Sequence, residues 1–200
     1  MNKILSNKTV ESTKYLPHFE EEPDIHPSAT IRNSIIEGKV HICENVHIVN
    51  AAIRADEGTP FYIGKNSNIQ DFAVLHAYCI HEYGNDLEQN KVYVENKGYF
   101  AIYIDEKVSL SHGVLVHGPS YVGKNSFIGF KATIDGANVG ENVEIGAHAY
   151  IKNVTIPDNT AIMPNAVITK EEDIEKYIIN SAGINKRIVN VNIEMAEVYK

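Results

Sequence analysis

The sequence predicts a mainly β protein, a parallel β-helix in which each hexapeptide repeat forms one short strand and one turn. Large aliphatic residues recur at every sixth position from Ile104 to Ile134. The position four residues after the large aliphatic is repeatedly small, as at Ser126 and Ala132. A narrow three-walled prism admits one large inward side chain per wall, so its inward neighbour has to be small. An antiparallel sandwich offers no reason for a six-residue period, and we favour the β-helix.

The repeat also divides the chain into segments. Residues 1–22 are polar and aperiodic, and we expect them to form an N-terminal arm that packs loosely on the body. The β-helix is predicted over 23–168, with an irregular rhythm at first and a strict one from Ile63. Residues 78–100 lose the rhythm and are predicted to leave the prism as a loop excursion, with a short hairpin at Val92–Val94.

Glycine and asparagine mark the corners of the predicted prism. Asn66 and Asn125 occupy the slot where turn residues that tolerate positive φ belong. Four glycines directly follow the large aliphatic residue of a hexad: Gly64, Gly123, Gly129 and Gly146. Each hexad therefore supplies one stretch of wall, one small inward residue and one corner.

Residues 169–200 are predicted to form C-terminal α-helices packed along the prism. Thr169 and Glu172 form a capping box that opens a first helix to about Ile179. After a break at 181–183, apolar residues recur at 3-4-3 spacing and indicate a second helix: Ile188, Val191, Met195 and Val198. Such a stripe cannot be buried by the helix alone, so we expect the helix to cover one wall of the prism.

Charge and cysteine content exclude several classes of function. The formal net charge is −8 and the longest basic grouping is Lys186-Arg187, which argues against a nucleic-acid partner and favours a small or neutral one. Cys43 and Cys79 lie far apart without C-x-x-C spacing, so neither a disulfide framework nor a thiolate zinc site is indicated. The N-terminus has no signal-peptide core and no stretch approaches a membrane span, so we predict a cytoplasmic protein with no membrane partner.

Spacing indicates that two histidines share a metal ion. His76 and His117 each directly follow a large aliphatic residue and so occupy the same slot of a hexad. Subtracting the 23 residues of the excursion from their separation of 41 leaves 18, which is three hexads or one full coil. The two imidazoles should then stack on adjacent coils, about 4.8 Å apart. Five other histidines are assigned surface roles: His18, His26, His41, His47 and His148.

A third histidine, His112, lies in the hexad before His117 and therefore on or near another wall. It does not easily reach the same ion within one subunit, but His112 of a neighbouring subunit would, and a trimer is the smallest closed ring that uses such a contact. Three neutral imidazoles leave the fourth position of Zn²⁺ open, which is the pattern of a catalytic site. Co²⁺ or Fe²⁺ fits the same ligands. The alternative is three unrelated surface histidines.

Polar residues cluster in sequence around these histidines. Gln70 and Asp71 are expected to face outward, one hexad before His76. From the residues alone, we assign Arg54, Asp56 and Asp71 to ion pairs at a subunit contact. Gln70 and Glu57 are better candidates for contact with a metal-bound hydroxide or its substrate.

An ordered set of motifs resembles the γ-class carbonic anhydrases. The set comprises R-x-D-E-G at 54–58, N-x-Q-D at 68–71, L-H-A at 75–77, S-L-S-H-x4-H-G-P at 109–119 and the C-terminal V-N-I-E-M-A-E-V-Y-K at 191–200. The resemblance implies a left-handed β-helix and a homotrimer with metal sites shared between chains. It also implies a zinc-type lyase, a carbonate dehydratase, in which metal-bound hydroxide reversibly hydrates CO₂ to bicarbonate and a proton.

The resemblance further implies a role for each matched residue. His76 and His117 of one chain and His112 of the next are the expected metal ligands. Gln70 and Asn68 are expected to orient the hydroxide or the substrate.

The remaining matched positions concern the pocket and proton transfer. Glu57 is the expected proton-transfer residue, and Asn192 is expected at the pocket edge near CO₂ or bicarbonate. Arg54, Asp56 and Asp71 match the inter-subunit ion-pair cluster, and the first two are also expected to shape the substrate pocket.

The chain departs from the family pattern near the excursion. A glutamate that ferries protons in the family prototype, three residues beyond the first metal histidine, is Cys79 here, and the loop is less acidic although His81, Glu82 and Glu88 remain. The tyrosine two residues before the pocket asparagine is Asn190. Losing a shuttle should slow turnover in weak buffer. His81, with an unperturbed pKa of about 6.5, is a suitable replacement.

Two other functions stay open. A hexapeptide-repeat acyltransferase would use one histidine as general base with an acyl-CoA or similar donor and would need no metal. A non-catalytic metal-binding or assembly protein could use the same scaffold, an option that the missing glutamate favours.

Overall fold

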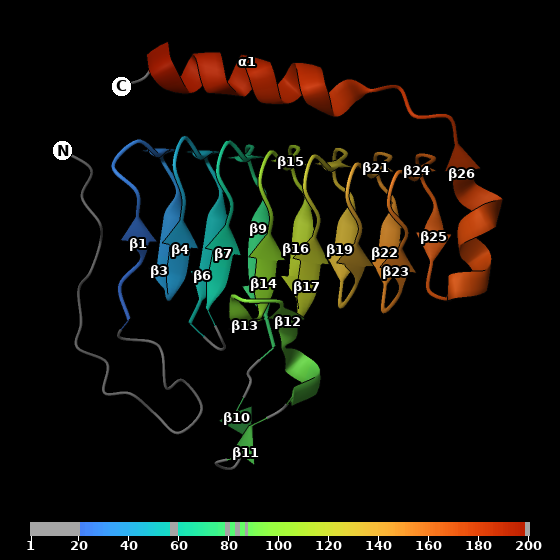
Figure 1. Ribbon diagram of the computed structural model, residues 1–200, viewed down its shortest axis with the longest axis horizontal. Helices are drawn as coiled ribbons and strands as arrows, with labels where there is room; N and C mark the ends of the chain where they lie inside the picture. Colours follow the sequence, from blue (N-terminus) through green and yellow to red (C-terminus); the bar gives the residue numbers. More distant parts are fainter. Residues whose placement is uncertain (1–20, 57–59, 79–80, 83–84, 87, 199–200) are drawn as a thin grey trace.

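The computed structural model describes residues 21–198, apart from 57–59, 79–80, 83–84 and 87. The described strands form a left-handed parallel β-helix, a long prism with three walls and one α-helix along its side (Figure 1). The predicted fold class is therefore confirmed.

Each wall is a sheet to which successive coils contribute one strand. Wall 1 comprises β1 (Asp24–Ile25), β4 (Val40–Ile42), β7 (Phe61–Ile63), β14 (Ile102–Ile104), β17 (Ser120–Val122), β20 (Asn138–Val139) and β23 (Thr155–Ile156). Wall 2 comprises β2 (Thr30–Arg32), β5 (His47–Val49), β8 (Asn68–Ile69), β15 (Ser109–Leu110), β18 (Phe127–Ile128), β21 (Glu144–Ile145), β24 (Ala161–Ile162) and β26 (Ile178–Ile179). Wall 3 comprises β3 (Ile35–Gly38), β6 (Ala52–Ala55), β9 (Val74–Ala77), β16 (Leu115–Gly118), β19 (Thr133–Asp135), β22 (Tyr150–Lys152) and β25 (Val167–Ile168).

The interior is filled as the six-residue period predicts. Ile104, Leu110 and Val116 lie on walls 1, 2 and 3 respectively, and all three are fully buried. The small residues Ser126 and Ala132 are also fully buried, so each coil places one large and one small side chain inward per wall. Stacking the coils joins these side chains into one continuous apolar core.

Residues at the corners of the prism are constrained in two different ways. Asn66 and Asn125 have φ of 59° and 60°, as expected for asparagine in a left-handed turn. Gly123 does not need a positive φ. A Cβ on Gly123 would lie 2.6 Å from the carbonyl carbon of Gly140 in the next coil, so the glycine is required by the close approach of two coils.

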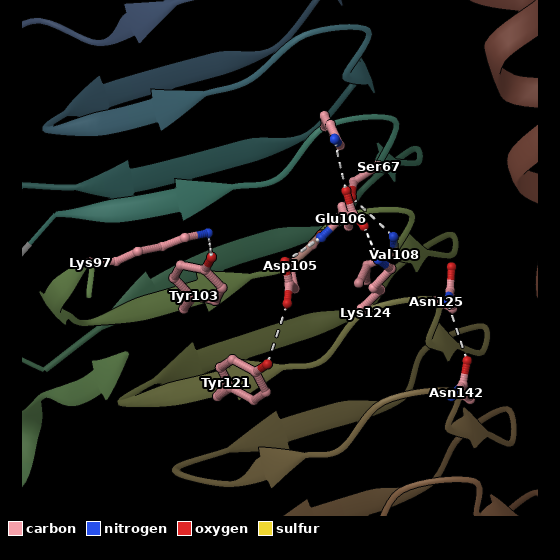
Figure 2. A network of polar contacts seen from close by, with 11 residues as sticks. Ser67, Lys97, Tyr103, Asp105, Glu106, Val108, Tyr121, Lys124, Asn125 and Asn142 are labelled. Carbon is pink, nitrogen blue, oxygen red and sulfur yellow. Dashed lines mark hydrogen bonds and ion pairs between the residues drawn. The ribbon is translucent and has the colours of Figure 1, made fainter. Parts of the chain in front are cut away.

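Interior serines tie neighbouring coils together at the corner between walls 1 and 2. The Ser67 hydroxyl donates to the Asp105 carbonyl at 2.8 Å and accepts from the Val108 amide at 3.0 Å (Figure 2). Ser126 repeats this arrangement with Gly140 and Val143 of the following coil. A small polar residue therefore satisfies buried backbone groups where the chain turns.

The excursion leaves the prism after β9 and returns before β14. Its described elements are β10 (His81–Glu82) paired with β11 (Asn85–Asp86), the 3-10 helix η1 (Glu88–Asn90), and the hairpin of β12 (Val92–Val94) and β13 (Gly98–Phe100). The Lys97 ammonium lies 4.7 Å from the ring centre of Tyr62 and 5.0 Å from that of Tyr103, and it donates to the Tyr103 hydroxyl (Figure 2). These contacts hold the second hairpin against wall 1.

The first predicted C-terminal α-helix is wrong. The segment is a 3-10 helix, η2 (Glu171–Tyr177), preceded by an extended Lys170 that makes no side-chain cap. Glu171 instead accepts a hydrogen bond from the amide of Thr155 at 3.0 Å, and Ile174 is buried against the prism. The chain then returns as β26, antiparallel to β24. A short, tight 3-10 turn suits this closure of the prism end better than an α-helix.

The second helix, α1 (Ile184–Val198), covers one wall of the prism as predicted, and that wall is wall 2 (Figure 1). The face that it buries differs from the predicted one. Val191 and Met195 of the predicted stripe are exposed, whereas Val189 and the polar Asn185 and Asn192 are buried. The reason is hydrogen bonding: Asn185 donates to the Lys107 carbonyl at 2.9 Å, and Asn192 bonds to the wall as described below.

Glu144 of β21 anchors the start of α1. Its carboxylate accepts hydrogen bonds from the amides of Ala182 and Ile184, at 2.9 and 2.8 Å. A carboxylate at a helix N-terminus satisfies amides that have no partner within the helix, and it is favoured by the helix dipole.

The chain ends complete the description. The predicted N-terminal arm, residues 1–22, lies outside the described residues except for Glu21 and Glu22, and Glu21 pairs with Lys39 at 3.1 Å. In the part of the chain that the structure describes, no helix combines the length and the apolar character needed to cross a membrane.

Candidate metal site

His76 and His117 lie side by side on the outer surface of wall 3. They are direct partners in the parallel pairing of β9 with β16, and their ring centres are 5.7 Å apart. The register that the spacing predicts is therefore confirmed, even though the excursion is inserted between the two strands. Both rings point away from the core because Leu75 and Val116, the preceding residues, point into it.

Neighbouring side chains orient the His117 ring. Asp135, its register partner on β19, places Oδ1 3.6 Å from His117 Nδ1. Asp135 also pairs with Lys152 at 2.9 Å. The ring of Tyr78 meets the imidazole edge-on at 4.3 Å between centres. The Asp135 carboxylate therefore faces the Nδ1 side of the His117 ring, at a distance longer than a hydrogen bond.

His112 lies at the corner between β15 and β16, with about half of its side chain exposed. Its Nδ1 is 3.1 Å from Asp71 Oδ2, and its ring is parallel to that of Phe130 at 5.6 Å. Asn50 donates to the other oxygen of Asp71 at 2.7 Å, and this bond is the main reason that the pKa of Asp71 is lowered. The ionised carboxylate therefore holds the imidazole proton on Nδ1, which directs the Nε2 lone pair outward.

The predicted ion-pair cluster is divided in the structure. Arg54 pairs with Asp56 at 2.6 Å and approaches Glu37 at 3.5 Å, all within one chain. Asp71 lies with His112 instead. That these groups pair across subunits stays a prediction.

Within a single chain, the described residues bring no three His, Cys, Asp or Glu side chains together as a metal-binding group. His76 and His117 form a pair on wall 3, and His112 projects from the corner that separates this wall from wall 2. The donor set fits a metal shared between chains, with two ligands from one surface and one from another, and their ligand role stays a prediction.

Gln70, Asn68 and Asn192 converge on wall 2, although Asn192 is distant in sequence. The Gln70 Nε2 group donates to Asn68 Oδ1 at 3.1 Å and to Asn192 Oδ1 at 2.7 Å. Asn68 Nδ2 donates to the Ser109 hydroxyl at 2.8 Å, and Asn192 Nδ2 donates to the Ile188 carbonyl at 2.9 Å. With both Nε2 protons used, Oε1 is the atom through which Gln70 can accept a further hydrogen bond.

This network lies beside His112. The Gln70 amide donates to the Leu110 carbonyl, and the Gly113 amide donates to the Asp71 carbonyl, so 70–71 pair with the coil that carries His112. The residues predicted to orient substrate thus share one corner with the predicted third ligand.

One neighbour of the network, His47, is predicted to lie on the surface, and that prediction is wrong. His47 is only 2% exposed, because α1 covers it. Burial is the main cause that lowers its pKa. Its strand partner is Asn68, whose partner in turn is Ser109. The six-residue period places His47, Asn68 and Ser109 in one column on the wall. This column and the predicted covering helix are the two signals from which the burial of His47 could have been predicted.

Glu57, a predicted proton-transfer residue, lies outside the described residues, as does Cys79, which replaces the shuttle glutamate of the family. His81, the other predicted proton-transfer residue, is described only as the first residue of β10. His41, by contrast with His47, is exposed on wall 1 and pairs with Asp24 at 2.7 Å.

Comparison with known proteins identifies relatives of this chain. It is 40% identical over 189 residues to the carbonic anhydrase of Methanosarcina thermophila, with 89% of this chain and 75% of that protein covered. It is 41% identical over 157 residues to the carboxysome assembly protein CcmM of Nostoc sp., where the match covers 78% of this chain and only 27% of the length of CcmM. No family model matches.

Solved structures share the architecture. A hexapeptide transferase family protein from Anaplasma phagocytophilum matches with a TM-score of 0.65 at 18% identity, covering 90% of this chain and 94% of that one. A provisionally assigned acetyltransferase from Bacillus cereus matches with a TM-score of 0.66 at 28% identity, covering 90% and 92%. These likenesses support the fold, and the carbonic anhydrase of Methanosarcina thermophila is similar in sequence over most of both chains. The chain therefore belongs to the γ-class carbonic anhydrase family of hexapeptide-repeat proteins.

Proposed function

We propose that the protein is a carbonic anhydrase of the prototype type, which interconverts CO₂ and water with bicarbonate and a proton at metal sites shared within a homotrimer. The observation that carries the proposal is the in-register pair of imidazoles, His76 and His117, on an outer wall. Catalytic Zn²⁺ takes three protein ligands, so this pair is an incomplete set. His112, held by Asp71 at a different surface, is the residue proposed to complete it from a second chain.

A second copy of the chain is the partner that wall 3 fits. Its outer surface carries a column of apolar side chains, in which Ile35 is 56%, Val74 37% and Val167 54% exposed. The polar column with His76 and His117 runs beside it. Exposed apolar strips of this kind mark protein interfaces. When one surface meets a different surface of its neighbour, a closed ring results, and three copies are the smallest ring that fits a three-walled prism.

The chemistry divides between the metal and the chain. When bound, Zn²⁺ lowers the pKa of a coordinated water to about 7 and so supplies a nucleophile at neutral pH. Gln70, with Nε2 committed to Asn68 and Asn192, presents Oε1 to orient the attacking water or bicarbonate. The exposed ring of Phe130 offers CO₂ an apolar surface beside His112. Co²⁺ or Fe²⁺ would suit the same imidazoles.

Each hydration releases a proton, and the chain needs a route for it. We propose Glu57, which follows Asp56 in the sequence, as first acceptor and His81 as carrier to the buffer. His81→Ala should then slow turnover at low buffer concentration and keep the wild-type rate at high buffer concentration, measured by stopped-flow CO₂ hydration. An unchanged rate in weak buffer would remove His81 from the route.

Mixing variants tests the shared site directly. His76→Ala and His112→Ala should each abolish activity. Co-refolded equal mixtures should recover about a quarter of the wild-type rate, because about three quarters of the rings are mixed and each mixed ring keeps one intact site of its three. A mixture of His76→Ala with His117→Ala is the matched control and should recover nothing, since both ligands come from one chain. Bound metal with no recovery in the first mixture would contradict the proposal.

A non-catalytic assembly role is the second candidate, and the likeness to CcmM favours it. An acyltransferase is the third, but the solved structures that suggest it share mainly the fold. Metal analysis followed by CO₂ hydration assays separates them: metal with hydration supports the anhydrase, metal without hydration at any buffer strength supports assembly, and an active metal-free protein with one essential histidine supports acyl transfer.

A further inference from the structure

We infer that Phe72 anchors the contact between two copies of this chain, with its ring packed on the apolar strip of wall 3 of the neighbouring copy. The inference rests on the proposed function and deepens it, because it names the side chain that seats one chain on the next. Phe72 directly follows the N-x-Q-D motif at 68–71 and is not part of it.

Phe72 has a backbone conformation that suits glycine or asparagine better than phenylalanine. It lies at the corner between walls 2 and 3, and its φ is 63°. The residues at the same place in the neighbouring coils, Asn50 and Gly113, are of the types that adopt positive φ readily. A bulky residue in this region is strained, and such strain concentrates where a residue has a function. The β-helix alone therefore gives no reason for phenylalanine at this corner.

The chain leaves the Phe72 ring uncovered. Phe72 is 77% exposed, which makes it the most exposed aromatic residue in the described part of the chain. Phe130 lies on the same corner, two coils further along, and is 51% exposed. His112, the proposed third ligand, belongs to the coil between them. The surface that presents His112 to a neighbour is therefore flanked by two exposed apolar rings, the pattern of an interaction surface.

Wall 3 carries the matching apolar surface. Val74 belongs to its exposed strip and points to the same side of β9 as His76, because the two residues are two positions apart on one strand. A neighbour that brings His112 to His76 and His117 thus places its corner over this strip. Phe72 and Val74 lie in the same coil, and equivalent coils are level in a three-fold ring whose axis runs along the prism. Phe72 of one copy therefore meets the strip near Val74 of the next.

One substitution should move two measurements in different directions. Phe72→Asn removes the ring and relieves the strained φ, so the urea midpoint of the dissociated chain should stay the same or rise. The protein concentration at which chains assemble should rise at least about tenfold, as expected when an interface anchor is lost. Sedimentation velocity of the metal-free protein over a dilution series measures assembly. A residue that served only the fold of the single chain would lower the urea midpoint instead.

Two controls separate the ring from the backbone conformation. Tyr93→Asn removes another exposed ring, on the hairpin of the excursion, and should leave assembly unchanged. Lys107→Asn replaces a residue with φ of 56° at the corner between walls 1 and 2, and it should also leave assembly unchanged.

Photo-crosslinking identifies the surface that the ring meets. A photoreactive phenylalanine analogue at position 72 should give covalent dimers joined to wall 3 of the second chain, and the same analogue at position 93 should give none. If Phe72→Asn weakens assembly and the crosslink maps to wall 3 while the metal-loaded wild type hydrates no CO₂, the contact stands and the proposed function fails. If the wild type is active and Phe72→Asn assembles at the wild-type concentration, the inference is overturned. A crosslink outside wall 3, or a wild-type chain that stays monomeric, overturns it as well.

Discussion

Two ladders of rings run along the outside of the prism, on wall 1 and on wall 3, and they are built differently. On wall 1, His41, Tyr62, Tyr103 and Tyr121 stack with ring centres 5.3, 4.6 and 5.5 Å apart and planes within 16° of parallel. Phe100 of the excursion packs edge-on against the middle of this ladder. Burial raises the pKa of the Tyr103 hydroxyl, so it stays neutral.

On wall 3, the His76 and His117 rings are tilted by 55° and do not stack. Their ladder continues into a carboxylate, Asp135, rather than another ring. In-register side chains on adjacent strands thus form a different arrangement on each of the two walls. Stacked aromatic rings stabilise wall 1, whereas the tilted imidazoles of wall 3 lie beside the Asp135 carboxylate.

The largest contrast is expected from removing one ring of each ladder. His117→Ala should reduce CO₂ hydration by at least about 100-fold because a proposed metal ligand is lost, yet it should cost less than about 1 kcal/mol of stability because the ring is partly exposed. Tyr103→Ala should cost about 3 kcal/mol because it leaves a cavity. Urea unfolding and stopped-flow assays measure the two effects. A fully folded Tyr103→Ala protein without activity would place wall 1 in the catalytic machinery.

The next effect in size concerns Asp135, which lies beside His117 and pairs with Lys152. Asp135→Asn should weaken zinc affinity by about 10- to 100-fold, since it removes the negative charge that orients and polarises His117. Lys152→Ala, which removes the cation but keeps the carboxylate, should change affinity by no more than about threefold. Competition with a chelator measures both. Equal effects of the two variants would mean that Asp135 serves the surface ion pair and not the imidazole.

The smallest expected effect concerns His47, the buried histidine of wall 2. Burial holds its pKa below the ordinary value of 6.5, so the unfolded chain binds more protons as the pH falls through about 6.5. The free energy of unfolding should therefore decrease below that pH, by at most about 1.4 kcal/mol per pH unit, until the folded pKa is reached. His47→Leu should flatten this part of the pH profile, and His41→Leu should not. The same slope in both variants would contradict the assignment.

The period made the walls predictable, including the pairing of His76 with His117 across the excursion. Both depend on counting residues along a scaffold whose coils have fixed length. What counting could not show is how separate elements dock. The buried face of α1 carries Asn185 and Asn192, because side-chain hydrogen bonds to the wall outweigh the burial of Val191. An apolar stripe alone cannot reveal that choice.

The same limit explains the errors about His47 and the first C-terminal helix. Burial of His47 follows from the position of α1, which is set by contacts far apart in sequence. The capping box at Thr169 is a local signal, and the structure does not follow it. The chain closes the end of the prism with a 3-10 helix instead, in which Glu171 accepts a hydrogen bond from the amide of Thr155. Local patterns decided the structure where the repeat continues, and long-range docking decided it where the repeat stops.

The insertion point of the excursion has a consequence for how such a protein can change. The chain leaves after β9 and re-enters before β14, yet β9 and β16 still pair without an offset. Additions, deletions or new acidic and basic groups in this loop would therefore leave the spacing of the two imidazoles untouched. The proposed proton route can therefore change by substitution in the loop without any change in the geometry of the proposed ligand pair.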